Sequence, residues 1–241
     1  MKAMILAAGY GKRLGELTQT TPKCLVPIGQ KVMLELVIDN LKKAGVTEIV
    51  INLFYLGAKI REFVEKKEGF GIQVKFSEEE IILGTGGGLK KAKELLAAEA
   101  PFFLHNGDIY SEYDLRELLR QHVASKECLA TVAVMNRKTS RPLIFNEEGC
   151  LIGWESKENN VGSVIDESPQ NQKLAFSGIQ VISPSLFEYV DADSGEFSII
   201  ASYMRAARAG GCIKACRMDD RFWIDMGTPE KLQELRDRIN Q

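Results

Sequence analysis

The chain has 241 residues and a formal net charge of −2, with 45% apolar and 27% charged residues. These values are those of an ordinary globular protein, and a nucleic-acid-binding protein would be expected to carry a basic excess that this chain lacks. The N-terminus has no apolar run long enough for a signal peptide or a membrane span, so we expect a cytoplasmic protein that binds neither nucleic acid nor membrane.

Strands and helices alternate through the first half of the sequence. Apolar strands are predicted at residues 3–8, 48–53, 72–77 and 101–106. Helices are predicted at residues 31–45, 57–69 and 114–125, with a further helix after the TGGG of residues 85–88. This alternation predicts an α/β fold: a Rossmann-like, mostly parallel mixed sheet with helices on both faces.

The second half of the sequence is richer in strands. They are predicted at residues 128–135, at 173–182, and in two short strands within 143–155 that are joined at 147–149. A helix at residues 197–211 precedes strands at 212–218 and 221–224, and a last helix begins at Pro229. No linker or repeat divides the chain. We therefore expect one domain over residues 1–241, with halves at 1–126 and 127–241 and a small strand-rich insertion in the second.

The cysteines and histidines suggest no zinc site. The five cysteines form no CxxC pair, and there are only two histidines. His105 lies in a predicted strand and His122 on a predicted helix, so we expect structural roles for both. Reduced, mostly buried thiols are expected in a cytosolic protein for all the cysteines: Cys24, Cys128, Cys150, Cys212 and Cys216.

The first strand is followed by a loop over residues 9–29, far longer than the two to six residues usual between a strand and a helix. Glycines after a strand let backbone N–H groups approach a phosphate closely, and Lys12, Arg13 and Lys23 supply positive charge. A dinucleotide-binding GxGxxG needs glycine where Leu14 stands, and a Walker A motif needs Ser or Thr where Arg13 stands. The alternative is a glycine turn with basic residues in solvent.

Two aspartates far apart in the sequence each follow a predicted strand. Asp108 comes after residues 101–106, and Asp225 comes after residues 221–224. Ligands of an open parallel sheet bind beyond the carboxyl ends of its strands, so the two carboxylates are candidates for one Mg²⁺ site shared with substrate phosphates. The alternative is that each aspartate caps the following turn or helix.

The N-terminal pattern resembles that of the sugar-1-phosphate nucleotidylyltransferases, whose signature is LAAGxGxRLxPLT followed by TPKPLxPI. This chain reads LAAGYGKRL at residues 6–14 and TPKCLVPI at residues 21–28. The departures are Gly15-Glu16 and Cys24. The resemblance implies a Mg²⁺-dependent reaction of a nucleoside triphosphate with a sugar 1-phosphate, giving a nucleotide sugar and pyrophosphate.

The resemblance also implies the roles of individual residues. Arg13 would bind the triphosphate and Lys23 would lie near the attacked phosphorus, as the two catalytic residues, with Asp108 and Asp225 as the metal ligands. Glu79, or else Glu80, would read the base edge, and the glycines of residues 86–88 would let backbone lie flat against the base. A simple loop cluster is the alternative for these glycines. The nucleotide-binding set is Leu6, Ala7, Ala8, Gly9, Gly11, Lys12, Arg13, Lys23, Glu79, Gly86 and Gly87.

On the sugar side the resemblance implies contacts from four residues, namely Asn106, Glu167, Ser177 and Gly178. The family's usual Glu-Lys-Pro stands here as Glu167-Ser168-Pro169. The missing lysine removes one expected contact with the sugar phosphate.

A sugar 1-phosphate is mostly a dianion at pH 7 and needs no general base. The expected catalysis is therefore electrostatic, with cations and Mg²⁺ offsetting repulsion between two anionic substrates. The sequence is most similar to the short bacterial N-acetylmuramate-1-phosphate uridylyltransferases and to the mannose- or heptose-1-phosphate guanylyltransferases, with UTP favoured over GTP. A non-catalytic nucleotide-sugar sensor is the alternative of another class. We expect a monomer or a small homo-oligomer.

Overall fold

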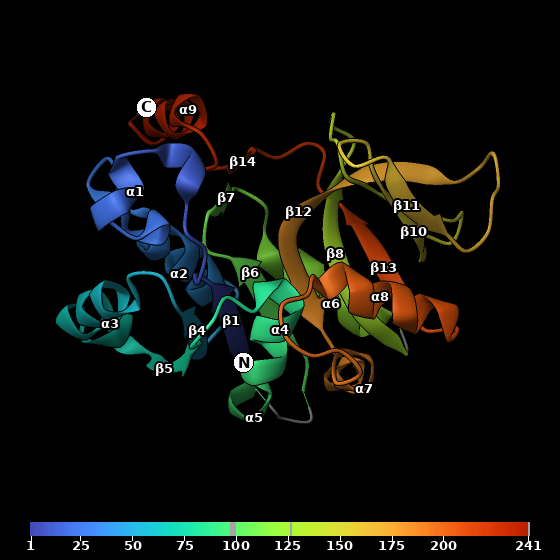
Figure 1. Cartoon of the computed structure of the whole chain (residues 1–241), viewed down its shortest axis with the longest axis horizontal. Helices are drawn as coiled ribbons and strands as arrows, with labels where there is room; N and C mark the ends of the chain where they lie inside the picture. The colour runs from blue at the N-terminus through green and yellow to red at the C-terminus, as the bar shows by residue number, and fades with distance from the viewer. Residues whose placement is uncertain (97–99, 126, 241) are drawn as a thin grey trace.

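The computed structural model of the chain describes residues 1–96, 100–125 and 127–240 (Figure 1). Within these ranges, a ten-stranded sheet runs through the molecule. Its strands are β1 (Lys2–Leu6), β4 (Glu48–Leu53), β5 (Gln73–Glu78), β6 (Phe102–Asn106), β8 (Cys128–Met135), β9 (Pro142–Phe145), β10 (Leu151–Ser156), β11 (Val161–Val164), β12 (Gln172–Ile182) and β13 (Cys212–Arg217).

The sheet has a parallel part and an antiparallel part. Strands β6, β1, β4 and β5 are adjacent and parallel, as the strand–helix alternation of the first half predicts. Strand β12 is antiparallel to β6, β8 and β9, and β10 and β11 extend the sheet beyond β9. The expected α/β class with a mixed sheet is confirmed.

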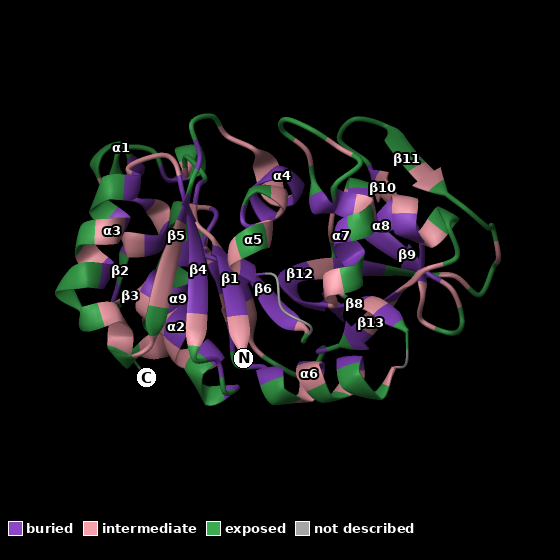
Figure 2. Ribbon diagram, turned by 90° about the horizontal axis from the view of Figure 1, so that it is seen from below, coloured by how far each residue is buried: buried purple, intermediate pink, exposed green. Residues whose placement is uncertain are grey.

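Helices cover both faces of the sheet, and the central strands are therefore buried on both sides (Figure 2). In β1, Ala3 and Ile5 belong to one core cluster and Met4 to the other, as the period of two in a strand requires. The first cluster packs against α2 (Met33–Lys43), α3 (Gly57–Lys66), α6 (Leu115–Ala124) and α9 (Pro229–Ile239). The second packs against α4 (Gly84–Lys91), α5 (Lys93–Leu96), α7 (Phe187–Val190) and α8 (Ile199–Arg208). No helix among the described residues combines the length and apolarity needed to cross a membrane.

The loop after β1 is folded rather than extended. It contains two 3₁₀ turns (Lys12–Leu14 and Lys23–Leu25), the short helix α1 (Leu17–Thr20), and a hairpin of β2 (Pro27–Ile28) with β3 (Lys31–Val32). Gly11 has φ 67°, and a Cβ built there would lie 3.1 Å from the Cβ of Lys23. A side chain at position 11 would therefore be both strained and crowded, and the turn brings Lys23 back towards the end of β1.

The two halves of the sequence interleave. Strand β14 (Trp223–Asp225) pairs antiparallel with β7 (Ile109–Ser111), and Ile109 lies opposite Asp225. Helix α9 then returns to the N-terminal loop, beside α1 in Figure 1, where Nη2 of Arg236 donates to the carbonyl oxygen of Pro27 at 3.0 Å. The proposed division into halves is not tested by this arrangement, and its boundary at residue 126 lies outside the described residues.

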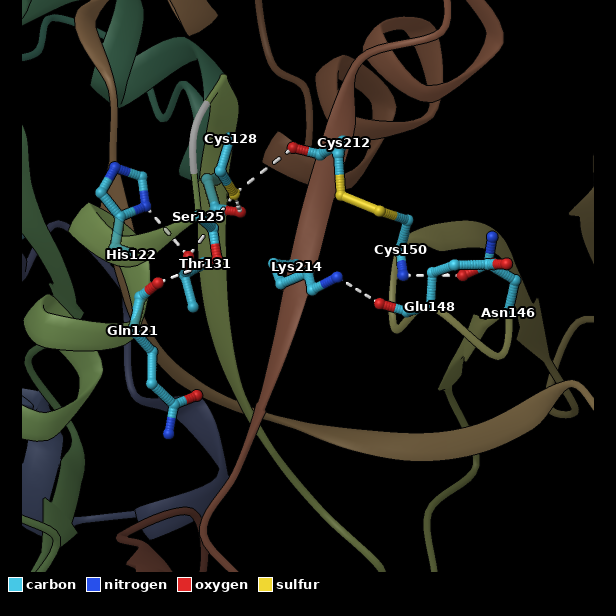
Figure 3. Close-up of a disulfide and its surroundings, with 11 residues drawn as sticks. Gln121, His122, Ser125, Cys128, Thr131, Asn146, Glu148, Cys150, Cys212 and Lys214 are labelled. Atoms are coloured by element: carbon cyan, nitrogen blue, oxygen red, sulfur yellow. Dashed lines mark hydrogen bonds between the residues drawn. A yellow bond between two sulfur atoms is a disulfide. The ribbon is translucent and has the colours of Figure 1, made fainter.

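A disulfide joins Cys150 to Cys212 (Figure 3). Position 150 forms an isolated bridge with Lys214 of β13, which places the two cysteines with their Cα atoms 5.4 Å apart, inside the range that a disulfide allows. The expectation of five reduced thiols is therefore wrong for this pair. The pair is 62 residues apart in the sequence, and no local motif marks it. The remaining cysteines are free and buried: Cys24, Cys128 and Cys216.

The disulfide predicts a thiol count and a stability difference. In denaturant without reductant, we expect three reactive thiols per chain, and five after reduction. Crosslinking positions separated by 62 residues stabilises the folded state by about 4 kcal/mol in the chain-entropy description. Replacing both Cys150 and Cys212 by serine should therefore lower the free energy of unfolding in guanidinium. Five reactive thiols in the unreduced, denatured protein would contradict the bridge.

Acid should destabilise the protein partly through His122, which is buried. Its Nδ1 lies 2.9 Å from Thr131 Oγ1, and its Nε2 lies 2.9 Å from Ser183 Oγ. Burial lowers the pKa of His122 from 6.5 to about 4. Between these values the unfolded chain binds a proton that the folded protein does not, so stability falls as the pH falls through this window. The free energy of unfolding can be measured in urea from pH 7 to pH 4. Its slope against pH should be smaller in His122→Gln than in the wild type, by up to about 1.4 kcal/mol per pH unit. The same slope in both proteins would contradict this.

Candidate active site

A cleft of about 200 Å³ lies at the carboxyl ends of β1, β4 and β6, where ligands of open α/β sheets bind. The end of β1 and the start of the long loop form one wall. Another wall is formed by Asn52 near the end of β4, Glu79 directly after β5, and the start of α4. The lining residues are Leu6, Ala7, Ala8, Gly9, Lys23, Asn52, Glu79, Ile82, Gly84, Thr85, Asn106, Gly107 and Asp108.

Lys23 and Asp108 meet in this cleft. Nζ of Lys23 donates to the Asp108 carboxylate, although 85 residues separate the two, and the lysine side chain is only 13% exposed. The second aspartate is brought near by β7 and β14, because the backbone N–H of Met226 donates to the Asp108 carbonyl oxygen at 2.8 Å. Lys231, on the first turn of α9, donates to the Asp225 carboxylate. The two aspartates therefore lie on neighbouring backbone segments, each with a lysine partner.

These two carboxylates are a suitable donor set for Mg²⁺. Oδ1 of Asp225 is shielded from solvent and has no hydrogen-bond partner among the described residues, which is unusual for a buried carboxylate oxygen. In the part of the chain that the structure describes, no group of three or more Asp, Glu, His or Cys side chains is arranged to hold a metal ion. Mg²⁺ fits such a site, since it usually takes one or two carboxylates and completes its shell with water and substrate phosphates.

The two basic residues of the glycine loop lie differently from each other. The Arg13 guanidinium lies against Gly227, where a built Cβ would be 3.1 Å from Nη2 of Arg13 and also in contact with Oδ1 of Asp225. Arg13 therefore faces the Asp225 side of the site. Lys12 instead lies over the Tyr10 ring, with Nζ 5.0 Å from the centroid. Neither side chain is part of the cleft lining, so a contact of Lys12 with a triphosphate requires a rearranged side chain.

Asn52 is a site residue that the sequence analysis missed. Its Oδ1 accepts from the Ala7 N–H at 2.7 Å, and its Nδ2 donates to Oε1 of Glu79 at 2.7 Å. The other Glu79 oxygen accepts from the Leu83 N–H at 3.0 Å. Burial raises the pKa of Glu79. One buried amide thus ties the loop after β1 to the expected base-reading carboxylate. The signal in the sequence is an asparagine near the end of the apolar run EIVINL.

The glycines at the start of α4 are required for a different reason from the one expected. A Cβ at Gly86 would lie 2.3 Å from the Phe197 ring, and a Cβ at Gly87 would lie 2.5 Å from the Gly195 carbonyl oxygen. Both glycines therefore pack against the segment before α8, and neither lines the cleft. Gly84 and Thr85 line it instead. The positions of residues 86 and 87 do not support the expected flat contact with a ligand, which stays a prediction.

A second, larger cavity of about 810 Å³ adjoins the cleft and shares Thr85 and Asn106 with it. It lies among β9, β10, β12 and α8, in the second half of the chain. Its walls carry apolar and basic side chains, including Leu143, Trp154, Phe176, Met204, Arg141 and Arg208. A second ligand group can therefore lie beside one that fills the first cleft.

Three of the four expected sugar-side residues lie near this cavity. Asn106 lines it, and Gly178, with φ 72°, is pressed against the Asn106 amide, which a Cβ would approach to 2.7 Å. Ser177 is fully buried, and its Oγ has no partner among the described residues. Glu167 is the exception, because it lies beside Ser168 and Pro169 in the lining of another cavity, which has only Glu155 in common with this one. The expected contact of Glu167 with the sugar is not supported by its position.

Comparison with known proteins agrees with this geometry. The profile of the nucleotidyl transferase family matches residues 2–241. N-acetylmuramate alpha-1-phosphate uridylyltransferase of Neisseria meningitidis is 30% identical over 98% of this chain and 97% of its own. D-glycero-alpha-D-manno-heptose 1-phosphate guanylyltransferase of Campylobacter jejuni is also 30% identical, over 95% of this chain and 96% of its own. The chain belongs to the nucleotidyl transferase family, and the expected resemblance to sugar-1-phosphate nucleotidylyltransferases is confirmed.

Solved structures share the fold. A putative glucose-1-phosphate thymidylyltransferase from Bacillus anthracis in complex with sucrose has a TM-score of 0.82 and 22% identity, covering 99% of this chain and 94% of that one. HddC from Yersinia pseudotuberculosis, complexed with GMP-PN, has a TM-score of 0.78 and 24% identity, covering 99% of both chains. At these identities the likeness shows the fold, and it confirms the expected nucleotide-diphospho-sugar transferase architecture.

The role of Asn52 can be tested by Asn52→Leu. Loss of the amide leaves the Ala7 N–H and one Glu79 oxygen without their partners, which should lower the free energy of unfolding by about 1–3 kcal/mol. It should also weaken nucleoside triphosphate binding about tenfold, measured by titration calorimetry. The control is Asn40→Leu, which removes a single 3.3 Å bond to the Ser111 carbonyl oxygen outside the cleft. Equal nucleotide affinity in wild type and Asn52→Leu would contradict the role.

Proposed function

We propose that this nucleotidyltransferase catalyses the Mg²⁺-dependent reaction of a nucleoside triphosphate with a sugar 1-phosphate, giving a nucleotide sugar and pyrophosphate. The favoured pair is UTP with N-acetylmuramate 1-phosphate or a related hexose 1-phosphate. The alternative is GTP with a mannose or heptose 1-phosphate. The names of the two relatives support both pairs, and the cavity of about 810 Å³ supports a bulky substituted sugar.

The observation that carries the proposal is the meeting of Lys23 with Asp108 in the glycine-lined cleft, next to the segment of Asp225. A triphosphate in the cleft would place its phosphates near Lys23 and on the Arg13 side of the site. The sugar phosphate, already a dianion, then attacks the α-phosphorus, and pyrophosphate leaves. Lys23 would stabilise the charge that develops on the α-phosphate oxygens. Mg²⁺ held by Asp108 and Asp225 would neutralise phosphate charge.

Glu79 and its neighbours would bind the nucleobase. A carboxylate accepts several hydrogen bonds, so each Glu79 oxygen keeps a lone pair beyond its contact with Asn52 or Leu83. It can accept from N3–H of uracil or from N1–H and the exocyclic amine of guanine. This pattern supports a base with a ring N–H donor, and it fits both UTP and GTP.

A non-catalytic nucleotide-sugar sensor is the alternative of another class. Such a protein would be expected to have lost a metal-binding aspartate or Lys23, whereas this chain has Lys23, Asp108 and Asp225. The retention of all three favours catalysis. A cytoplasmic location and a monomeric or small homo-oligomeric state stay predictions.

Pyrophosphate release from a matrix of UTP and GTP with N-acetylmuramate, mannose and heptose 1-phosphates tests the function. We expect one pair to be turned over, with no turnover in EDTA. Lys23→Ala should lower kcat by about 10²–10³, the loss typical when one preorganised stabilising group is removed. Lys31→Ala, which removes a half-exposed lysine paired with Asp39, should leave kcat unchanged.

Two outcomes of this experiment would contradict different parts of the proposal. Near-normal turnover by Lys23→Ala would show that Lys23 is not a catalytic residue. Nucleotide binding by the wild-type protein without pyrophosphate release from any pair would favour the sensor.

A further inference from the structure

Arg137 is a half-buried cation that the proposed reaction does not yet use. It follows β8, and its guanidinium lies over the Trp223 ring, with Cζ 4.0 Å from the centroid. Nη2 donates to the Phe176 carbonyl oxygen at 3.0 Å. This is the one hydrogen bond of the guanidinium within the described part of the chain, and Nε is shielded from solvent without an acceptor. A guanidinium has five N–H donors, so most of its capacity is unused.

Arg137 is held between the larger cavity and the strand of Asp225. Phe176, which accepts its hydrogen bond, lines that cavity. Trp223, which supports its other face, lies two residues before Asp225 and is itself fixed by a 2.8 Å hydrogen bond from Nε1 to the Ser177 carbonyl oxygen. Arg137 does not itself line either cavity, and these two contacts hold its guanidinium between Phe176 and the segment of Asp225.

Positive charge exceeds negative charge at this point. Lys231 already binds the Asp225 carboxylate, and Arg13 lies against Gly227 beside it. Burial lowers the pKa of Arg137. The nearby Asp225 carboxylate has the smaller, opposite effect and raises this pKa. One carboxylate thus faces three cations. Burying a guanidinium whose N–H donors have no acceptors costs free energy, and a bound anion would offset that cost.

We propose that Arg137 binds the phosphate of the sugar 1-phosphate and replaces the lysine that is absent at position 168. The inference rests on the proposed function. Ser168 lies with Glu167 at a separate cavity, so that segment does not supply the contact. A sugar bound in the larger cavity with its phosphate directed towards Asp225 would bring that phosphate beside Arg137, whereas a triphosphate would approach from the glycine loop. A guanidinium clamped on an indole ring presents paired N–H groups to two phosphate oxygens.

Steady-state kinetics test the inference directly. Arg137→Met keeps apolar volume over Trp223 and removes the donors, and Arg137→Lys keeps the charge. We expect Arg137→Met to raise KM for the sugar 1-phosphate 10- to 100-fold while KM for the nucleoside triphosphate changes less than twofold, with partial recovery in Arg137→Lys. Arg116→Met, at an arginine whose side chain is 70% exposed on α6, is the matched control. Equal rises in both KM values, or no rise, would overturn the inference.

A binding measurement separates this inference from the proposed function. Trp154→Phe leaves Trp223 as the sole tryptophan, so fluorescence reports on the ring beneath Arg137. Titration with inorganic phosphate should give a saturable change in this background and no change when Arg137→Met is added. A signal that survives Arg137→Met, or no saturable signal, would overturn the inference. If the wild-type protein released no pyrophosphate with any substrate pair, the proposed function would fail, and this titration would still decide whether Arg137 binds phosphate.

Discussion

The site depends on pairing between two short strands, β7 and β14, that are distant in the sequence. Their ladder, extended by the bond from Met226 N–H to the Asp108 carbonyl oxygen, fixes the backbone of one aspartate beside that of the other. Each carboxylate then holds a lysine, Lys23 or Lys231. The acids thereby reduce the repulsion between the cations that gather at this point before anionic substrates bring further negative charge. Without this pairing, Asp108 and Asp225 would lie on two loops that no backbone hydrogen bonds hold together.

Much of the architecture follows from local patterns. Apolar runs alternating with amphipathic segments identify β1, β4 and β6 and their helices, because a parallel strand buried on both faces must be apolar throughout. Strand β5 lies at the edge of the sheet and is only partly buried, and apolar and polar residues alternate in it. Asp108 and Asp225 are visible because each stands at the end of a predicted apolar strand, and the structure places Asp225 within β14 as its last residue. Short elements such as β11 and α7 were missed, because a few residues carry too little periodicity. Strand β7 was missed for the same reason, although it is the partner on which Asp225 depends.

The rest of the site depends on long-range contacts that one sequence does not display. The Cys150–Cys212 bridge and the packing of Gly86 against Phe197 both join segments that no spacing rule connects. Glu167 does not lie at the expected sugar side, because the segment that carries it lines another cavity. Asn52 was open to prediction in part, since an amide within a buried apolar strand must find partners. Which partners it finds, the Ala7 N–H and Glu79, depends on the fold.

The return of α9 to the N-terminal loop has a consequence for how the protein is made. Synthesis proceeds from the N-terminus, and domains usually fold as they emerge. Here the hydrogen bond from Arg236 to Pro27, in the loop that carries Lys23, forms only after α9 has been synthesised. The pairing of β7 beside Asp108 likewise forms only after β14 has been synthesised. The emerging polypeptide therefore cannot complete the candidate site until β14 and α9 have left the ribosome. A nascent chain stalled after β13 would have most of its core and no working site.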